Sequence, residues 1–336
     1  MIEQKDAGKS TRDTEKIKDT EKDGEEKHGF VKEMLKNIYT HHYKKLLFIT
    51  ILVTLLSITQ IAYQFTSTGE LFKKDVSIKG GLIITIPTEN YADFNIKELA
   101  NALKELYSYS IDVEEVRTGT EQIALVIKAD STDKSETDTL IQTLSEKTSI
   151  NSKEFNIEMT GSSLGKSFFR DLLYAILMAF VFMGIVVFIY LRTPIPSIAV
   201  IVCAFSDMVG TLAVVNLMGM ELSSAGIIGF LLLIGYSVDT DMLLTIRVLK
   251  RKEGTYMERI FDSLSTGMGM TLTTLAAVIV SLFVSKSAVI TEIMTILLIG
   301  LIFDMFYTWI QNVAILRLFI EHKEKKEREA ASNTRG

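Results

Sequence analysis

The chain has 336 residues, of which 48% are hydrophobic and 23% charged, and its formal net charge is −5. This balance, without a basic face interleaved with aromatic residues, argues against nucleic-acid binding. The single cysteine, Cys203, excludes internal disulfides and thiolate metal sites. The sequence also has no convincing nucleotide loop, nucleophile triad or zinc motif, so we expect no enzymatic activity, no cofactor and no metal.

The first part of the chain changes from polar to apolar. Residues 1–43 mix both charge signs without apolar periodicity, which predicts a disordered, charged cytoplasmic tail. Residues 46–65 form an apolar run of about the 20 residues that a membrane helix needs. Lys44 and Lys45 precede this run, so the positive-inside rule places the N-terminus in the cytoplasm. The long polar stretch ahead of the run argues against a cleavable signal peptide.

Residues 66–167 have the composition of a soluble domain inserted after the first span. A β-branched run after Gly80–Gly81 stops at Pro87, which indicates a strand. The following periodicities predict a helix, two strands around a turn, a second helix and a last strand. This β-α-β-β-α-β order is the ferredoxin-like split unit. After the first strand, the predicted elements cover 95–109, 112–117, 122–129, 135–148 and 155–159.

The region 168–319 contains five further apolar runs, each long enough to cross a membrane. Basic residues follow the first, third and last of these runs. Counting alternate crossings places both termini in the cytoplasm and the inserted domain outside, with 320–336 as a second charged cytoplasmic tail. The predicted fold is therefore an α-helical polytopic membrane protein with six transmembrane helices and an inserted α+β extracytoplasmic domain. The five runs are 168–191, 195–218, 223–247, 267–285 and 288–319.

Two glycines, Gly267 and Gly269, lie at the beginning of the fifth span. Because glycine is the least favourable helix residue after proline, we expect a bend here, where a surface helix turns into the membrane.

Four aspartates lie inside these apolar runs: Asp207, Asp239, Asp241 and Asp304. An ionised carboxylate at bilayer depth costs about 2.5–3.5 kcal/mol on insertion scales, so such acids face a protein interior or a wet cavity. A single acid is commonly a helix-packing contact, whereas four acids in three spans indicate a polar internal pathway. We interpret them as proton-titrating groups, with interhelical hydrogen bonding as the alternative.

Helix geometry separates some of these charges. Asp239 and Asp241 are about 200° apart around a helix axis, so they cannot share one small site. Arg247 lies about 12 Å along the axis from Asp239, too far for direct pairing within the helix. Two interpretations remain for Arg247: an anchor that snorkels to the cytoplasmic interface, and a counter-charge that reaches Asp207 from another helix.

Several stretches resemble the SecF subunit family of the SecD–SecF protein-export complexes. They are similar to the family's first extracytoplasmic strand motif, its re-entrance into the membrane, its mid-helix acid, its Gly-Tyr-Ser signature with a downstream arginine, and the start of its fifth span. The matching residues are Asp75 with Gly80 and Gly81, 161–171, Asp207 in 204–207, Gly235, Tyr236 and Ser237 with Arg247 in 235–251, and 265–275.

Two features look like the archaeal branch of this family. Asp239-Thr240-Asp241 stands where bacterial members usually carry Asn-Asp, and Asp304 stands where they lack an acid. The resemblance implies a six-span half of an RND-superfamily architecture in the cell membrane. It also implies a SecD-like subunit, the Sec translocon channel and the translocating preprotein as partners, with membrane lipid around the spans. The function that it implies is protein transport coupled to the proton gradient.

Two other functions stay open at this point. The chain could be a proton-driven RND-type exporter of small molecules, although one small external domain leaves little surface for a substrate pocket. It could also be a structural scaffold for the translocon, in which the acids serve only as interhelical hydrogen bonds.

Overall fold

A computed structural model describes most of the chain. The predicted tail at 1–43 lies almost wholly outside them, as do Gly161 and the tip of the predicted turn at 118–120. The described residues are 39, 42–87, 96–118, 121–131, 133–148, 150–160, 162–251, 253–285 and 287–333.

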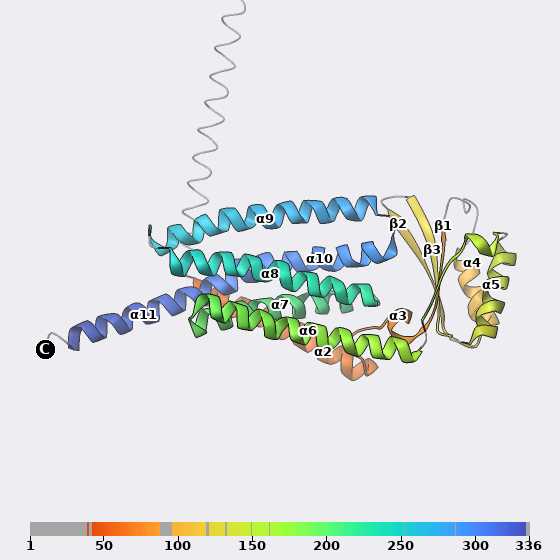
Figure 1. The fold of residues 1–336 in the computed structure, drawn as a ribbon, viewed down its shortest axis with the longest axis horizontal. Helices are drawn as coiled ribbons and strands as arrows, with labels where there is room; N and C mark the ends of the chain where they lie inside the picture. Colours follow the sequence, from red (N-terminus) through yellow and green to blue (C-terminus); the bar gives the residue numbers. More distant parts are fainter. Residues whose placement is uncertain are drawn as a thin grey trace, which may run out of the picture.

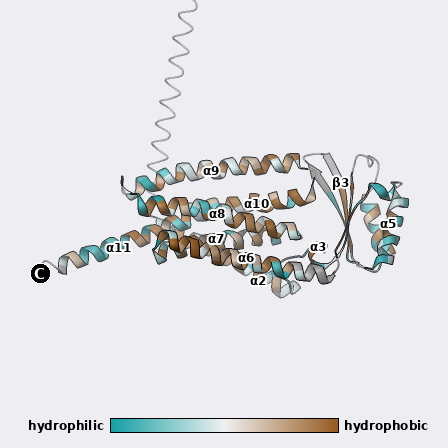
Figure 2. Cartoon of the chain, viewed as in Figure 1, coloured by the Kyte–Doolittle hydropathy of each residue, from teal (hydrophilic) through white to brown (hydrophobic). Residues whose placement is uncertain are grey.

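Six helices in the described part of the chain are long and apolar enough to cross a membrane, as the sequence predicted. They lie side by side in one elongated bundle, with a small sheet at one end (Figure 1). Hydrophobic residues dominate the long helices, whereas α5 and the far part of α11 are hydrophilic (Figure 2). The bundle consists of α2 (Tyr43–Thr68), α6 (Ser162–Leu191), α7 (Pro194–Leu217), α8 (Ser224–Lys250), α9 (Tyr256–Val284) and α10 (Ala288–Phe306), which continues as η3 (Tyr307–Asn312) and α11 (Val313–Asn333).

Local chemistry sets several helix starts. Proline occupies the first turn of α7, where its missing N–H removes no helix hydrogen bond. The side chain of Ser223 accepts hydrogen bonds from the first backbone N–H groups of α8. Thr255 and Glu258 form a reciprocal capping box at the start of α9. These caps allow sharp transitions between helix and connecting loop.

The fifth span differs from the prediction, because α9 runs without interruption from Tyr256 to Val284. No bend separates a surface helix from the span. Gly267 instead lies against Trp309, where a Cβ would collide with the indole ring. This glycine therefore allows a close approach of two elements, which local propensity cannot reveal.

The bundle has an inner pair and an outer pair of helices. About half of the apolar window of α7 (56%) and α8 (50%) is buried, whereas only 11% of α2 and 6% of α6 is buried. Gly300 of α10 permits close packing, since its Cβ would lie 2.5 Å from Leu233 of α8. Asp207 and Asp241 are therefore carried by the two most buried helices, and α10, which carries Asp304, packs closely against α8.

The sheet belongs to the domain inserted between α2 and α6, and it has the predicted ferredoxin-like topology. Its four strands are all antiparallel in the order β2-β3-β1-β4. Helices α4 and α5 cover one face, and the other face is turned toward the membrane helices (Figure 1). The elements are β1 (Gly81–Pro87), α4 (Ile96–Leu106), β2 (Ile111–Thr118), β3 (Glu121–Ala129), α5 (Lys134–Thr148) and β4 (Asn156–Thr160).

Strand alternation gives this sheet its two different faces. The face under α4 and α5 carries fully buried aliphatic side chains such as Leu82, Ile84 and Ile127. The opposite face carries charged residues, including Glu114 of β2 and Lys128 of β3. The apolar face therefore forms the domain core, and the charged face meets the membrane bundle.

A short helix, α3 (Val76–Lys79), leads into β1 and was not predicted. Asp75 caps it by accepting a hydrogen bond from Ser77 N at 2.9 Å. Gly80 and Gly81 have φ of 94° and 151°, a region that L side chains rarely adopt. A Cβ at Gly81 would also collide with the Ala129 carbonyl. The glycine pair is thus required by the turn from α3 into the sheet.

Candidate functional site

Three of the four intramembrane aspartates meet in the interior of the bundle. Asp207 from α7, Asp241 from α8 and Asp304 from α10 are each 0% exposed. In the described part of the chain no salt bridge reaches any of them. Their contacts are instead neutral hydroxyl and amide groups, which are typical partners of polar groups between membrane helices.

Asp207 is held by the residue that ends the Gly-Tyr-Ser stretch. The Ser237 hydroxyl of α8 donates to Asp207 Oδ2 at 2.5 Å. Both side chains are buried, so this contact ties α7 to α8 away from water. At 2.5 Å the contact lies at the short end of the range for hydrogen bonds between two oxygen atoms.

Asp241 and Asp304 share one hydroxyl group. Thr308 Oγ1 lies 2.9 Å from Asp241 Oδ1 and 3.1 Å from Asp304 Oδ1. A threonine hydroxyl has a single proton to donate, so it can satisfy only one ionised carboxylate at a time. For both contacts to be hydrogen bonds, the other carboxylate must carry a proton and donate it to Thr308. The arrangement therefore suits a pair of acids that hold one proton between them.

Asn312 completes this network. Its Nδ2 donates to Asp241 Oδ1 at 2.8 Å and lies 3.5 Å from Thr245 Oγ1. Gln311 approaches Cys203 Sγ at 3.6 Å and Ser206 Oγ at 3.5 Å, next to Asp207 along α7. Polar groups thus continue from the Asp241–Asp304 pair toward the Asp207 side of the bundle.

Four buried oxygens in this cluster accept no hydrogen bond within the described residues. They are Asp207 Oδ1, Asp241 Oδ2, Asp304 Oδ2 and Asn312 Oδ1. Buried polar atoms are nearly always paired, so orphaned oxygens on three neighbouring acids require an explanation. Each of these carboxyl oxygens is a place where a proton can reside.

The Thr308 hydroxyl and the Gln311 and Asn312 amides come from a π-helical segment, η3, between α10 and α11. Single π turns inside α-helices are rare and are concentrated at functional sites. The wider turn places Thr308, Gln311 and Asn312 in the interior, all buried, while the chain continues as one helical run.

Sequence reasoning missed these three residues. The signal was present, because Asp304, Thr308, Gln311 and Asn312 are spaced as one polar stripe along an apolar span. Ser237 was singled out only through the Gly-Tyr-Ser resemblance. Its role as the partner of Asp207 depends on the packing of α7 against α8.

Two of the predicted intramembrane charges lie outside the cluster. Asp239 is exposed, whereas Asp241 is fully buried. Arg247 Nη1 donates to the Asp262 carbonyl at 2.9 Å and to Thr266 Oγ1 at 2.8 Å, both on α9. Arg247 therefore braces α8 against α9 near the end of the bundle, and the structure does not place it beside Asp207.

The other members of the Gly-Tyr-Ser stretch face outward. Gly235 and Tyr236 are exposed, and a Cβ at Gly235 would meet nothing within 4 Å. With Asp239 they belong to one exposed stripe along α8, whose period of three to four residues marks a single helix face. The stripe consists of Ile228, Leu232, Gly235, Tyr236 and Asp239.

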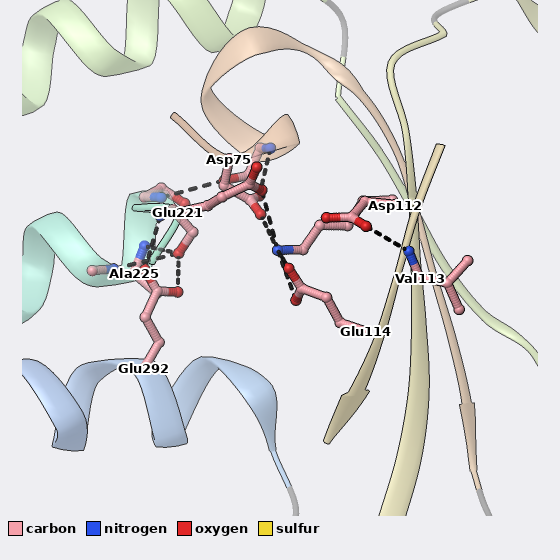
Figure 3. Close-up of polar contacts among 12 residues, drawn as sticks. Asp75, Asp112, Val113, Glu114, Glu221, Ala225 and Glu292 are labelled. Carbon is pink, nitrogen blue, oxygen red and sulfur yellow. Dashed lines mark hydrogen bonds and ion pairs between the residues drawn. The ribbon is translucent and has the colours of Figure 1, made fainter. Parts of the chain in front are cut away.

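The predicted extracytoplasmic strand motif lies far from the acids, at the junction between the sheet and the bundle (Figure 3). Asp75 is 3% exposed and pairs with Lys128 of β3 at 2.7 Å. Gly80 and Gly81 form the turn from α3 into β1. Nowhere in the described ranges do three His, Cys, Asp or Glu side chains gather in a way that could hold a metal ion.

Comparison with known proteins gives consistent matches. Residues 140–322 match the family model described as "Protein export membrane protein SecD/SecF, C-terminal". The chain is 35% identical to the protein-export membrane protein SecF of Pyrococcus furiosus over 298 residues, which cover 88% of this chain and 98% of that one. It is 34% identical to SecF of Methanocaldococcus jannaschii over 291 residues, with coverage of 84% and 98%.

A solved structure matches the fold over most of the chain. The crystal structure of SecDF from Thermus thermophilus, described as a translocon-associated membrane protein, superimposes with a TM-score of 0.63 at 19% identity. The match covers 83% of this chain and only 38% of that longer chain. The fold of a six-span bundle with an inserted ferredoxin-like domain is therefore shared.

Proposed function

The chain belongs to the SecD/SecF family of protein-export membrane proteins, and on that premise we propose that it uses the proton gradient to promote preprotein translocation together with a SecD-like subunit. Protons exchange at Asp207, Asp241 and Asp304. The resulting rearrangement of α7, α8 and α10 moves the external domain, which engages preprotein emerging from the Sec translocon channel.

One observation carries the proton part of this proposal: the single Thr308 hydroxyl within hydrogen-bond distance of both Asp241 and Asp304. Adding or removing a proton there changes which carboxyl donates and which accepts. Because the two acids lie on α8 and α10, such a change alters a contact between two central helices. A proton moving through the membrane potential supplies about 2.3 kcal/mol per 100 mV, enough to bias two arrangements of the bundle when a few protons move.

The exposed stripe on α8 supports a membrane-embedded partner. An acid exposed in the middle of an apolar span is costly against lipid, and Asp239 stands in this stripe beside Tyr236. A second helical subunit that covers the stripe would remove Asp239 from lipid. The SecDF structure is more than twice as long as the matched part, which leaves room for a second half in that protein.

The basic residues at one end of the bundle support an orientation in the membrane. Lys44, Lys250 and Arg251 lie at helix ends on the side of α11, opposite the sheet (Figure 1). Basic residues flanking short connections favour the cytoplasmic side. We therefore place both termini in the cytoplasm and the sheet domain outside the cell membrane.

The decisive experiment replaces Asp304 by asparagine. Asp304→Asn keeps a donor for Thr308 but cannot release a proton. We expect normal assembly with the SecD-like subunit and loss of the gradient-dependent part of preprotein translocation into energised membrane vesicles. Asp262→Asn is the control, because Asp262 is an exposed acid at the end of the bundle.

Undiminished gradient-dependent translocation by assembled Asp304→Asn would contradict proton coupling and favour the scaffold function. Vesicles that lack this chain give the other test. If they translocate preprotein normally but no longer export a small molecule, the alternative function as a small-molecule exporter is favoured.

A further inference from the structure

A cavity of about 540 Å³ separates the charged face of the sheet from the ends of α8 and α10. Its walls come from β1, β2, β3 and β4 on one side and from the α7–α8 loop and α10 on the other. The cavity is crossed by polar contacts that connect the two sides (Figure 3). These contacts form the main polar junction between the external domain and the membrane helices.

Lys128 is the centre of the junction. Its Nζ lies 2.7 Å from Asp75 Oδ2, 3.0 Å from Glu114 Oε2 and 3.5 Å from Glu221 Oε2. The lysine side chain is only 12% exposed. Burial opposes its charge, but the carboxylates of Asp75 and Glu114 outweigh burial and raise the pKa of Lys128 above its ordinary value. The lysine therefore remains a cation at neutral pH.

One of the three carboxylates belongs to the sheet, and the other two belong to segments attached to the membrane helices. Glu114 lies on β2, in the same sheet as Lys128. Asp75 lies in the segment fastened to the α7–α8 loop, where Asp75 N donates to Leu222 O at 2.9 Å and Leu222 N donates to Lys73 O at 2.8 Å. Glu221 lies in that loop itself. Asp75 and Glu221 both belong to the part attached to the membrane helices, which we call the base. Lys128 thus connects the sheet to two acids of the base, and Asp75 is the nearer of them.

The base side of the junction continues directly into the helices that carry the buried acids. Glu292 of α10 accepts hydrogen bonds from Ser223 N at 2.8 Å and Ser223 Oγ at 2.5 Å. Ser223 is the N-cap of α8 and follows Glu221 closely in the chain. The ends of α8 and α10 are therefore clamped together next to Lys128, and these helices carry Asp241 and Asp304 further along.

We propose that Lys128 and Asp75 form an electrostatic latch that makes the external sheet move with the ends of α8 and α10. The latch deepens the proposed function and rests on it, since it names the contact through which helix movement reaches the external domain. Without the cation, two base carboxylates and one sheet carboxylate repel each other across the cavity. Without Asp75, Lys128 keeps Glu114 within its own sheet and its hold on the base is weakened.

The chain offers a matched set of variants. Asp75→Asn retains the α3 cap, because asparagine caps helices as well as aspartate does, but it removes the ion pair. Glu114→Gln removes an equal charge from beside Lys128 without breaking the connection to the base. Lys128→Met removes the cation, and Lys153→Met is its control on an exposed part of the same domain.

The measurement is the distance between two nitroxide labels in the full chain, assembled with its SecD-like subunit in lipid nanodiscs. The labels are attached at Asp138→Cys on α5 and Val284→Cys at the end of α9, both exposed, with Cys203→Ala as background. We expect Asp75→Asn and Lys128→Met to broaden and shift the distance distribution. Glu114→Gln and Lys153→Met should leave it unchanged. Because the two latch residues share one ion pair, combining Asp75→Asn with Lys128→Met should change the distribution by less than the sum of the two single changes.

An unchanged distribution in both Asp75→Asn and Lys128→Met would overturn the latch. So would an equal broadening by Glu114→Gln, or a strictly additive effect of the double substitution. The readout is independent of export, so failure of the latch is distinguishable from failure of proton coupling, which Asp304→Asn tests.

Discussion

At the scale of single residues, the Thr308 hydroxyl group is the main candidate for a residue that couples two buried acids. Thr308 is the described residue that contacts both Asp241 and Asp304, and it lies in the π-helical turn. Loss of this hydroxyl would remove one hydrogen-bond partner from each acid, and a buried polar group without a partner costs free energy. Asn312 would remain as a donor to Asp241, but not to Asp304.

We predict that Thr308→Val, which keeps the shape and removes the hydroxyl, lowers the free energy of unfolding by about 1–3 kcal/mol. Gradient-dependent translocation should fall with it. The measurement is denaturation of the purified protein in mixed micelles, followed by the vesicle assay. Thr59→Val on α2 is the control, since the Thr59 hydroxyl is exposed and bonds only to its own helix. Equal stability and export in the two variants would show that the shared hydroxyl is dispensable.

At the scale of elements, Gly267 lets α9 approach Trp309 of η3 closely. The sequence suggested a bend at Gly267 and Gly269, but the two glycines have different surroundings. Gly267 faces Trp309 of η3 at a distance that excludes any side chain, and Gly269 faces open space. Only the packing partner distinguishes them, which is why helix propensity alone misjudged this region.

We predict that Gly267→Ala destabilises the protein by about 1–3 kcal/mol, because a methyl group there must displace Trp309. Gly269→Ala should be neutral or stabilising by up to about 1 kcal/mol, because alanine is the better helix former and nothing opposes it. Thermal unfolding of the two variants in the same detergent compares them directly. If both substitutions have the same effect, close packing at Gly267 does not contribute to stability.

At the scale of the whole molecule, the sheet domain and the membrane bundle meet through few polar contacts, and the main one depends on charge. The groups that face Lys128 are Asp75, Glu114 and Glu221. Burial raises the pKa of Glu221, and the Asp75 and Glu114 carboxylates add to the rise against the opposing effect of Lys128. An acid with a raised pKa binds its proton more tightly in the docked state, so mild acidification does not release the sheet.

We predict how docking of the sheet depends on alkaline pH. The pKa of Lys128 is raised in the docked state, so its contribution is fully present below the ordinary lysine value of 10.5 and is lost only as the pH rises beyond it. The nitroxide distance between α5 and α9 should therefore stay constant from neutral pH to about that value. Lys128→Met should have no such alkaline transition. A transition near neutral pH in the unaltered chain would contradict this assignment.

Much of this protein is determined by its sequence alone, because local composition and periodicity are sufficient. Six apolar runs of membrane length and a β-α-β-β-α-β pattern predicted a fold that the structure confirms. The same local rules located four acids at bilayer depth and predicted that Asp239 and Asp241 point in different directions, in agreement with the exposure of one and the burial of the other.

Which side chains meet was decided only by the tertiary structure. The packing of α7, α8 and α10 gathers Asp207, Asp241 and Asp304 around hydroxyl and amide donors, and it directs Arg247 of α8 to hydrogen-bond partners on α9. The π-helical turn that supplies Thr308 and Asn312 has no signature in local propensity. Asp75 and Lys128 are separated by a whole strand-helix-hairpin unit in the chain, yet they touch at the junction. Such contacts depend on the relative placement of finished elements, which local spacing does not specify.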